Sequence, residues 1–236
     1  MMFLAAETIL PSQIVYEDNH LIIINKKASE IVQGDKTGDM PLSEKVKNYI
    51  KQRDNKPGNV FCGVCHRLDR PVSGIVIFAK TSKALSRINE LFRDKTIQKT
   101  YWAVVKNKPP HITERLTHYL IKNEKTNTSK AFATEKSGSL KAELSYTLIA
   151  SISNYHLLEI NLYTGRHHQI RAQLSAIGCP IKGDLKYGFD RSNQTPFIHL
   201  HSYKTEFIHP IKLEPISITC KPKTDDTVWN ELMKAI

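Results

Sequence analysis

The pattern of apolar residues most constrains the fold of this chain, because it predicts many short strands and few helices. Alternating apolar and polar residues, or runs of β-branched and aromatic residues bounded by turn residues, are typical of strands. Strands that do not alternate regularly with helices favour an α+β fold with a mainly antiparallel, mixed central sheet flanked by helices and loops. We expect strands over residues 14–16, 21–24, 75–79, 97–105, 142–150, 156–163, 197–202 and 216–220.

Helical spacing is confined to a few segments. Leu42, Val46 and Ile50 recur at the interval that places side chains on one face of a helix. Thr81 is of a residue type that caps the N-terminus of a helix, and Gly178 is suited to end one. The helices are expected at about 42–50, 81–92, 167–177 and 228–236.

Positive charge is concentrated in one part of the chain. The 236 residues include 34 Lys or Arg against 23 Asp or Glu, a formal net charge of +11. Of this charge, +9 falls between residues 80 and 141, which contain 14 cationic and 5 anionic residues. Such a chain most often meets a polyanion, and nucleic acid is the first candidate. Residues 106–141 are predicted to be the least regular part, either a nucleic-acid-binding flank or a solvated loop.

Composition excludes several classes of protein. With 40% hydrophobic and 24% charged residues the chain is globular rather than disordered. No apolar run approaches the ~20 residues that a membrane span needs. Residues 1–6 are apolar, but they lack a basic start and meet Glu7 too soon for a signal peptide. We therefore expect a cytoplasmic protein whose four cysteines are free thiols.

The densest cluster of reactive side chains lies at residues 66–74, which read His-Arg-Leu-Asp-Arg-Pro-Val-Ser-Gly. Asp69 stands between Arg67 and Arg70, and nearby opposite charge favours the ionised carboxylate. An ionised carboxylate is a poor general acid but a usable nucleophile. The same residues also fit a surface turn whose salt bridge is worth little energetically.

This cluster and four other blocks closely resemble the RluA family of RNA pseudouridine synthases. The catalytic loop of the family reads His-Arg-Leu-Asp, two variable residues, Thr-Ser-Gly and a hydrophobic strand, and this chain departs from it at Val72, where threonine is usual. The Lys-x-Tyr strand of the family and its Gly-Arg-x-His-Gln-Ile-Arg segment are also matched. The five blocks stand in the family's order at residues 14–26, 66–80, 99–103, 165–188 and 201–210.

The resemblance implies the pseudouridine synthase catalytic fold, with a central RNA-binding cleft, and it implies roles for matching residues. Asp69 takes the position of the catalytic aspartate, Tyr101 that of the tyrosine that stacks on the target base, and Arg171 that of the basic residue that pairs with the aspartate. Arg67 matches an arginine that fills the gap left by the flipped nucleotide. The other residues expected to contact RNA are His66, Arg70, Lys80, Lys99, Arg166, His168 and Gln169.

The implied reaction cuts the bond between ribose carbon 1 and uracil nitrogen 1, turns the base, and rejoins it through carbon 5. It is redox-neutral, so we expect neither a metal nor a cofactor. One carboxylate suffices, as nucleophile or as base, and the sequence leaves that choice open. Because the target uridine must leave its stack, the expected partner is a structured RNA, either ribosomal or transfer RNA.

Two alternatives stay open at this point. Cys62 and Cys65 precede His66 in the Cys-x-x-Cys-His pattern of covalent haem attachment. That pattern is not expected to bind haem, because His66 opens the catalytic block and no export signal is present, so the cysteines are either two small buried residues or a regulatory thiol pair. The alternative function is a non-catalytic RNA-binding or RNA-folding protein on the same fold, which would not need the catalytic set.

We expect a single catalytic domain over residues 1–236 that acts as a monomer. Many relatives in the RluA family carry a small RNA-binding domain before the catalytic domain. Here the first matching block begins near Ile14, which leaves no room for such a domain. Selection of the target RNA would then rest on the catalytic domain itself, including the basic stretch at 80–141.

Overall fold

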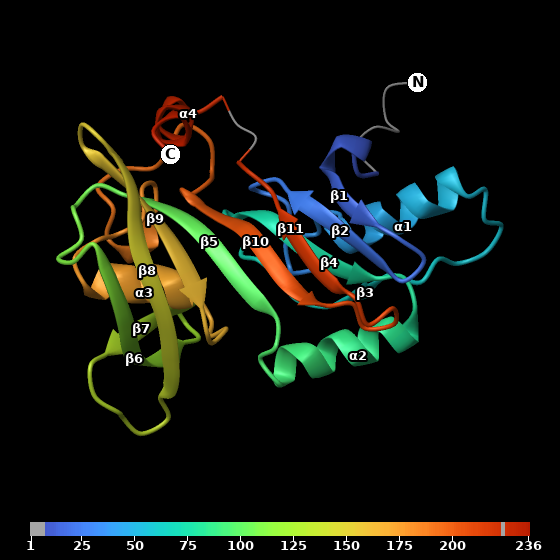
Figure 1. Ribbon diagram of the computed structural model, residues 1–236, viewed down its shortest axis with the longest axis horizontal. Helices are drawn as coiled ribbons and strands as arrows, with labels where there is room; N and C mark the ends of the chain where they lie inside the picture. The colour runs from blue at the N-terminus through green and yellow to red at the C-terminus, as the bar shows by residue number, and fades with distance from the viewer. Residues whose placement is uncertain (1–7, 223–224) are drawn as a thin grey trace. The chain divides into compact units, whose positions relative to one another are not determined.

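The computed structural model of the protein describes residues 8–222 and 225–236, and the chain divides into two compact units (Figure 1). Unit 1 comprises the N-terminal part of the chain up to Ile97 together with Lys204–Cys220. Unit 2 comprises Gln98–Tyr203 and the C-terminal part from Lys221. The boundary falls within strand β10 (Leu200–Ile208), which therefore contributes residues to both units.

Antiparallel strands form the centre of unit 1. Strand β2 (Leu21–Lys26) lies between β1 (Ile14–Glu17) and β4 (Ser73–Ala79), and the short β3 (Gly63–Val64) also pairs with β4. Strand β10 pairs with β11 (Pro215–Thr219). The strands predicted at residues 14–16 and 21–24 are therefore confirmed, and they pair as a hairpin.

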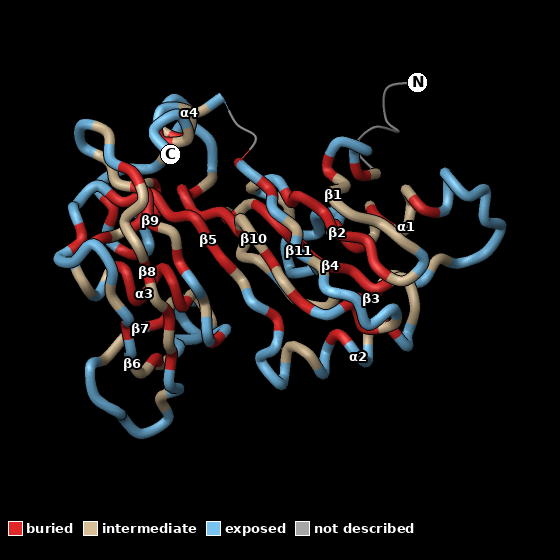
Figure 2. Tube along the Cα trace, viewed as in Figure 1, coloured by how far each residue is buried: buried red, intermediate tan, exposed pale blue. Residues whose placement is uncertain are grey.

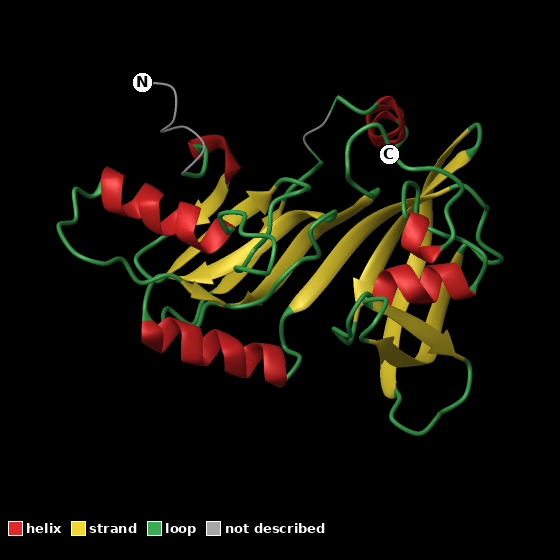
Figure 3. Cartoon of the chain, turned by 180° about the vertical axis from the view of Figure 1, so that it is seen from behind, coloured by secondary structure: helices red, strands yellow, loops and turns green. Residues whose placement is uncertain are grey.

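Two helices of unit 1, α1 (Leu42–Arg53) and α2 (Ser82–Arg93), pack on opposite faces of these strands (Figure 3). Successive residues of a strand point to opposite faces, so Ile22 packs with α1 whereas Ile23 packs with α2. Every residue of β2 is buried, as the red trace in Figure 2 shows. Thr81 caps the N-terminus of α2, as predicted.

Unit 2 is built on an antiparallel sheet whose strands follow the order β5-β9-β8-β6-β7. These strands are β5 (Gln98–Val105), β6 (Thr113–Asn123), β7 (Thr128–Phe132), β8 (Leu140–Ile152) and β9 (Tyr155–Leu162). One face packs against α3 (Gln169–Ala176) and the 3-10 turn η3 (Leu185–Tyr187). The other face is covered at one end by α4 (Thr227–Lys234), whose Trp229 packs with Trp102 of β5.

A further 3-10 turn, η2 (Pro11–Gln13), precedes β1. Across residues 8–222 and 225–236, none of the helices has the length and apolar character needed to cross a membrane.

The prediction that residues 106–141 are the least regular part is wrong. Strands β6 and β7 form a hairpin there, and β6 alone spans 11 residues. The strand pattern is weak in the sequence because one face of β6 is polar and exposed, and only Leu116 and Leu120 of this strand are buried. The strand predicted at 197–202 begins later, at Leu200. The other predicted strands and helices are confirmed to within a few residues.

Candidate active site

The loop that joins β3 to β4 carries four of the predicted site residues, His66, Arg67, Asp69 and Arg70. The backbone N–H of Val72 donates to the carbonyl oxygen of Asp69 at 3.0 Å, so a tight turn follows the carboxylate directly. His66 anchors the start of the loop, because its Nε2 accepts a hydrogen bond from the backbone N–H of Ile77 at 3.1 Å. Its ring also lies 5.0 Å from the ring of Phe92 on α2.

Lys26, the last residue of β2, is fully buried and ties the turn after Asp69 to the strands of unit 1. Its Nζ donates hydrogen bonds to the backbone carbonyls of Lys27, Arg70 and Val72, at 3.0, 3.2 and 2.7 Å. Burial lowers the pKa of this ammonium to about 8, against the attraction of nearby carboxylates that include Asp69. The sequence does not predict this role, because the partners are backbone carbonyls that only the fold brings within reach.

Two residues fix how the loop runs into β4. Gly74 has a φ of 111°, a backbone conformation that side chains with a Cβ disfavour, so the glycine of the motif is required by local geometry. Val72, which stands where the family has threonine, is only 2% exposed. A buried apolar side chain at this position needs no hydrogen-bond partner, so the substitution is compatible with the loop.

Three other basic residues predicted to contact RNA differ in their surroundings. Arg67 is exposed. Arg70 forms an ion pair with Asp39, and Lys80 places its Nζ 2.6 Å from Oε1 of Glu17. The charges of Arg70 and Lys80 are therefore matched by carboxylates of the same unit, and their binding to RNA stays a prediction.

Strand β5 of unit 2 carries Lys99 and Tyr101 on the same face. Tyr101 is 6% exposed and lies opposite Ile160 of β9, on the face of the sheet that α3 covers. The Nζ of Lys99 lies 3.6 Å from the position that a Cβ would take at Gly165, and burial lowers the pKa of this ammonium. Lys99 therefore lies beside the segment 165–171, which holds four other predicted residues.

Gln169 holds the backbone of that segment in shape. Its Oε1 accepts hydrogen bonds from Oγ1 of Thr164 at 2.7 Å and from the backbone N–H of Arg166 at 3.0 Å, and its Nε2 donates to the carbonyl of Glu143 at 3.1 Å. His168, at the N-terminal end of α3, has a left-handed backbone with a φ of 52°. Gln169 thus bonds to other groups of the protein, whereas Arg166 is exposed.

Arg171 on α3 is 4% exposed and is held from two sides. Its Nε and Nη2 donate to the two carboxylate oxygens of Asp184 at 2.7 and 2.8 Å, a bidentate pair. Its guanidinium also lies over the ring of Tyr187, 4.9 Å from the ring centroid. The hydroxyl of Tyr187 accepts from the backbone N–H of Ser129 and lies 2.8 Å from Nδ1 of His168. Asp184 and Tyr187 lie in a matched block, but the sequence assigns them no role.

Cys62 and Cys65 lie on opposite sides of the strands of unit 1. Cys62 packs with the core on the α1 side and Cys65 with the core on the α2 side. Both thiols are free, and burial raises the pKa of each to about 12. A thiol that stays protonated is a poor nucleophile. The two half-buried cysteines therefore lack the features of a regulatory thiol pair.

His199 and His167 are engaged with other protein groups. Nε2 of His199 lies 2.9 Å from Oδ1 of Asp226, and its ring stacks on Trp229 with 5.4 Å between centroids. Nδ1 of His167 lies 2.9 Å from Oγ of Ser129. Among the residues that the structure describes, no group of three or more His, Cys, Asp or Glu side chains is placed to hold a metal ion.

The predicted residues therefore form two groups, each held by its own unit. In unit 1 the group is the Asp69 loop, which supplies a carboxylate. In unit 2 the group is β5 together with α3 and the segment before it, which supplies the phenol of Tyr101 and the guanidinium of Arg171.

Comparison with known proteins gives the class of this chain. A family model described as RNA pseudouridylate synthase matches residues 20–176. The chain is 33% identical over 210 residues to ribosomal large subunit pseudouridine synthase C of Buchnera aphidicola, covering 86% of this chain and 65% of that protein. It is 28% identical over 240 residues to tRNA pseudouridine synthase C of Vibrio parahaemolyticus, covering 93% of each chain. The chain thus spans slightly less than two thirds of the first relative and nearly all of the second.

The fold agrees with this assignment. The solved structure of human RNA pseudouridylate synthase domain containing 4 superposes with a TM-score of 0.78 at 21% identity, covering 95% of this chain and 94% of that chain. The predicted α+β fold is therefore confirmed. The chain belongs to the RNA pseudouridylate synthase family, whose members are isomerases that act on RNA.

Proposed function

We propose that this protein is an RNA pseudouridine synthase that isomerises specific uridines in ribosomal or transfer RNA. Two relatives that are named for these two classes of RNA support the proposal. The observation that carries it is the Asp69 loop, in which the buried ammonium of Lys26 holds the turn directly after the carboxylate. A carboxylate fixed in position is already oriented toward a bound uridine, so less conformational entropy is lost when the two react.

In the proposed reaction, the bond between ribose carbon 1 and uracil nitrogen 1 breaks and a bond from carbon 1 to carbon 5 forms. Nitrogen 1 ends with a proton, and carbon 5 loses its own. No electrons are gained or lost overall. The Asp69 carboxylate acts either as a nucleophile, which attacks the ribose or the uracil ring, or as a general base, which removes a proton.

Tyr101 and Arg171 take the other catalytic roles in this proposal. The ring of Tyr101 provides a flat surface for the uracil, and its phenol is a candidate for removing the proton from carbon 5. Arg171 takes the role of the basic residue that pairs with the catalytic aspartate. The bidentate pair with Asp184 uses two N–H groups of this guanidinium and fixes its direction.

The remaining assignments concern the RNA and the state of the enzyme. We propose that Arg67 fills the gap left by the flipped nucleotide and that Lys99, Arg166 and His168 contact the RNA. The two units act together as one catalytic domain, and the enzyme works in the cytoplasm as a monomer. Arg67, Lys99 and Arg166 are cations, and the two arginine side chains are exposed, which suits contacts with phosphates.

The test compares wild-type protein with Asp69→Asn, and pseudouridines are mapped in total cellular RNA treated with each. Asp69→Asn should abolish pseudouridine formation and leave the affinity for RNA nearly unchanged, because the amide keeps the shape of the carboxylate but not its charge. The matched control is Asp94→Asn, which makes the same chemical change at an exposed residue beside Arg93 and should keep full activity. Wild-type protein that leaves every uridine unmodified would show that the proposed function is wrong.

A further inference from the structure

The unit 2 sheet has a second face, which points away from α3 and Tyr101. We call it the outer sheet face. Strand register places one set of residues on it, because side chains alternate along each strand and Tyr119 lies opposite both Phe132 of β7 and Lys141 of β8. Its exposed or half-buried residues include Arg115, Tyr119, Lys130, Phe132, Lys141 and Tyr163.

Aromatic rings and cations lie together on the outer sheet face. Tyr163 is 43% exposed, and the guanidinium of Arg115 lies over its ring at 4.9 Å from the centroid. The ammonium of Lys130 lies 5.3 Å from the centroid of the Phe132 ring. A hydroxyl also lies beside Tyr163, because Oγ of Ser145 is 2.9 Å from the hydroxyl of Tyr163. Each ring is thus presented next to a positive charge.

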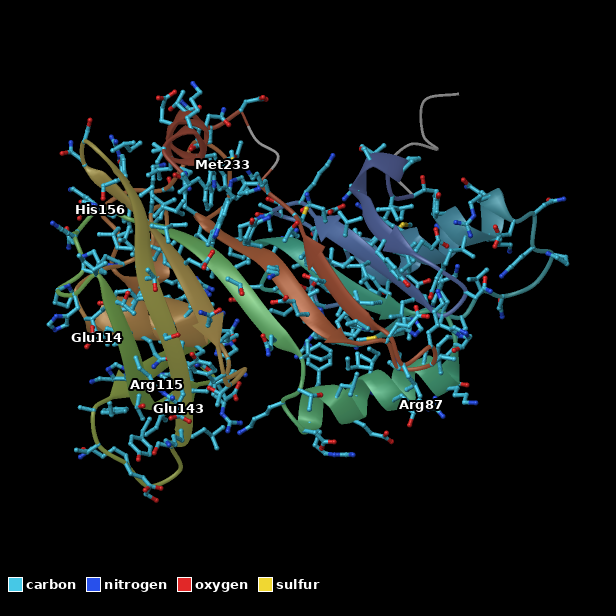
Figure 4. The ribbon with its side chains drawn as sticks, viewed as in Figure 1. Arg87, Glu114, Arg115, Glu143, His156 and Met233 are labelled. Carbon is cyan, nitrogen blue, oxygen red and sulfur yellow. The ribbon has the colours of Figure 1, made fainter. Side chains whose placement is uncertain are left out.

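One carboxylate orders two of these cations. Oε1 of Glu143 lies 3.3 Å from Nη2 of Arg115 and 3.2 Å from Nζ of Lys141. Figure 4 shows Arg115 on β6 and Glu143 on β8 next to each other on this sheet. Three cations against Glu143, and against Glu159 at the α4 end of the same face, leave the face positively charged, which is complementary to a polyanion.

We propose that the outer sheet face binds a single-stranded segment of the RNA substrate, at a place separate from the catalytic residues. The bases stack on Tyr163, Phe132 and Tyr119, and Arg115, Lys130 and Lys141 meet the phosphates. The identity of the RNA rests on the proposed function, whereas the binding itself does not. The face lies on the side of the sheet opposite Tyr101, so RNA held here is a different segment from the one that carries the target uridine.

The chemistry of the face favours single-stranded RNA over other occupants. In a duplex the bases stack on one another and present only their edges, whereas in a single strand each base offers a flat surface to an aromatic ring. The cations and hydroxyl groups around the rings suit the phosphate and sugar oxygens of such a strand. Stacking on rings with nearby cations is the usual way of holding single strands without sequence preference.

The test measures binding of a fluorescein-labelled 12-nucleotide oligoadenylate, which contains no uridine for the catalytic residues to act on. Tyr163→Ala should weaken binding about tenfold, because loss of one stacked base changes affinity by roughly that factor. Tyr163→Phe keeps the ring and should bind nearly as well as the wild type. The double variant Arg115→Gln/Lys141→Gln should lower the slope of log Kd against log salt by about 1.4, since each phosphate contact on a single strand contributes ~0.7.

The control is Lys51→Gln/Lys234→Gln, which removes two positive charges from exposed positions on α1 and α4 and should leave the slope unchanged. Circular dichroism on all variants separates loss of binding from loss of folding. Unchanged affinity in folded Tyr163→Ala, or equal losses in Tyr163→Ala and Tyr163→Phe, would overturn the proposal. A wild-type dimer that Tyr163→Ala converts to monomer, with oligoadenylate binding unchanged, would assign the face to self-association instead.

Pseudouridine formation is measured separately on the same variants. At saturating RNA, Tyr163→Ala should keep the wild-type rate and show a raised KM. If the wild type forms no pseudouridine but the oligoadenylate results hold, the proposed function fails and the RNA-binding face stands. If pseudouridine forms but the variants bind oligoadenylate like the wild type, the proposed function stands and the RNA-binding face is wrong.

Discussion

Replacing Lys26 by methionine tests how the Asp69 loop is held in place. The change keeps the length of the side chain and removes the ammonium that donates to three backbone carbonyls, two of them in the loop. Hydrogen bonds to a charged group contribute ~1.5–3 kcal/mol each, and relief of the buried charge offsets part of their loss. We expect the free energy of unfolding at pH 7 to fall by about 2 kcal/mol.

The dependence on pH gives the sharper prediction. In the folded protein the pKa of Lys26 is lowered from 10.5 to about 8, mainly by burial. Between these values the unfolded chain binds more protons at this site than the folded chain does, so raising the pH favours folding. A pKa shift of this size corresponds to a free-energy difference of about 3 kcal/mol between the folded and unfolded states. The gap in unfolding free energy between wild type and Lys26→Met should therefore widen by about 3 kcal/mol between pH 8 and pH 10.5.

The assay is urea unfolding of both proteins at a series of pH values from 7 to 10.5, followed by circular dichroism. Other lysines and tyrosines titrate in both proteins, and their contributions cancel in the difference. Lys51→Met removes a lysine at an exposed position of α1 and is the control, for which no widening is expected. Parallel curves for wild type and Lys26→Met would refute the assignment of a charged, buried Lys26.

The same variant should affect catalysis if the loop positions Asp69. Displacement of a reacting group by about 1 Å costs on the order of 100-fold in rate. Lys26→Met is expected to lower kcat for pseudouridine formation far more than it raises KM, because the loop rather than the RNA-binding surface is disturbed. A change in KM alone would show that Lys26 acts on RNA binding.

Two further substitutions test the support of the remaining site residues. Asp184→Asn leaves the buried guanidinium of Arg171 without its counter-charge and should destabilise the protein by about 3–5 kcal/mol, measured as a lowered Tm; an unchanged Tm would show that the pair is not buried. Gly74→Ala forces a Cβ into a backbone with a φ of 111° and should cost about 1–3 kcal/mol. Gly58→Ala, with open space around its Cβ position, is the control and should change stability by less than about 0.5 kcal/mol.

Local features of the fold could be predicted from the sequence. The hairpin of β1 and β2 and the cap at Thr81 depend on neighbouring residues, so alternation and residue type suffice to find them. The β6–β7 hairpin escapes prediction because β6 has only Leu116 and Leu120 buried among polar residues. A strand with one solvated face and a polar turn is hard to distinguish from a loop.

The support of the candidate site could not be predicted in the same way. Resemblance to a family points to Asp69 and Arg171, but it does not show that Lys26 reaches carbonyls 44 and 46 residues away. Nor does it show that Asp184 pairs with Arg171 or that Asp39 pairs with Arg70. These contacts depend on how distant segments pack. The sequence alone does not show which cation pairs with which carboxylate or carbonyl.

The discontinuity of unit 1 has a consequence for how the chain folds during synthesis. Its core on the α2 side joins Leu21 and Ile23 to Phe207 and Cys220, and Arg87 of α2 donates to the carbonyl of Pro210 at 2.8 Å. A ribosome makes the first of these residues long before the last, at roughly 5–20 residues per second. The apolar strands of unit 1 therefore lack their last packing partners during the time in which residues 98–203 of unit 2 are synthesised. Premature contacts of β2 and β4 with other chains are the hazard in that interval, and the two helices that flank these strands shield them while they wait.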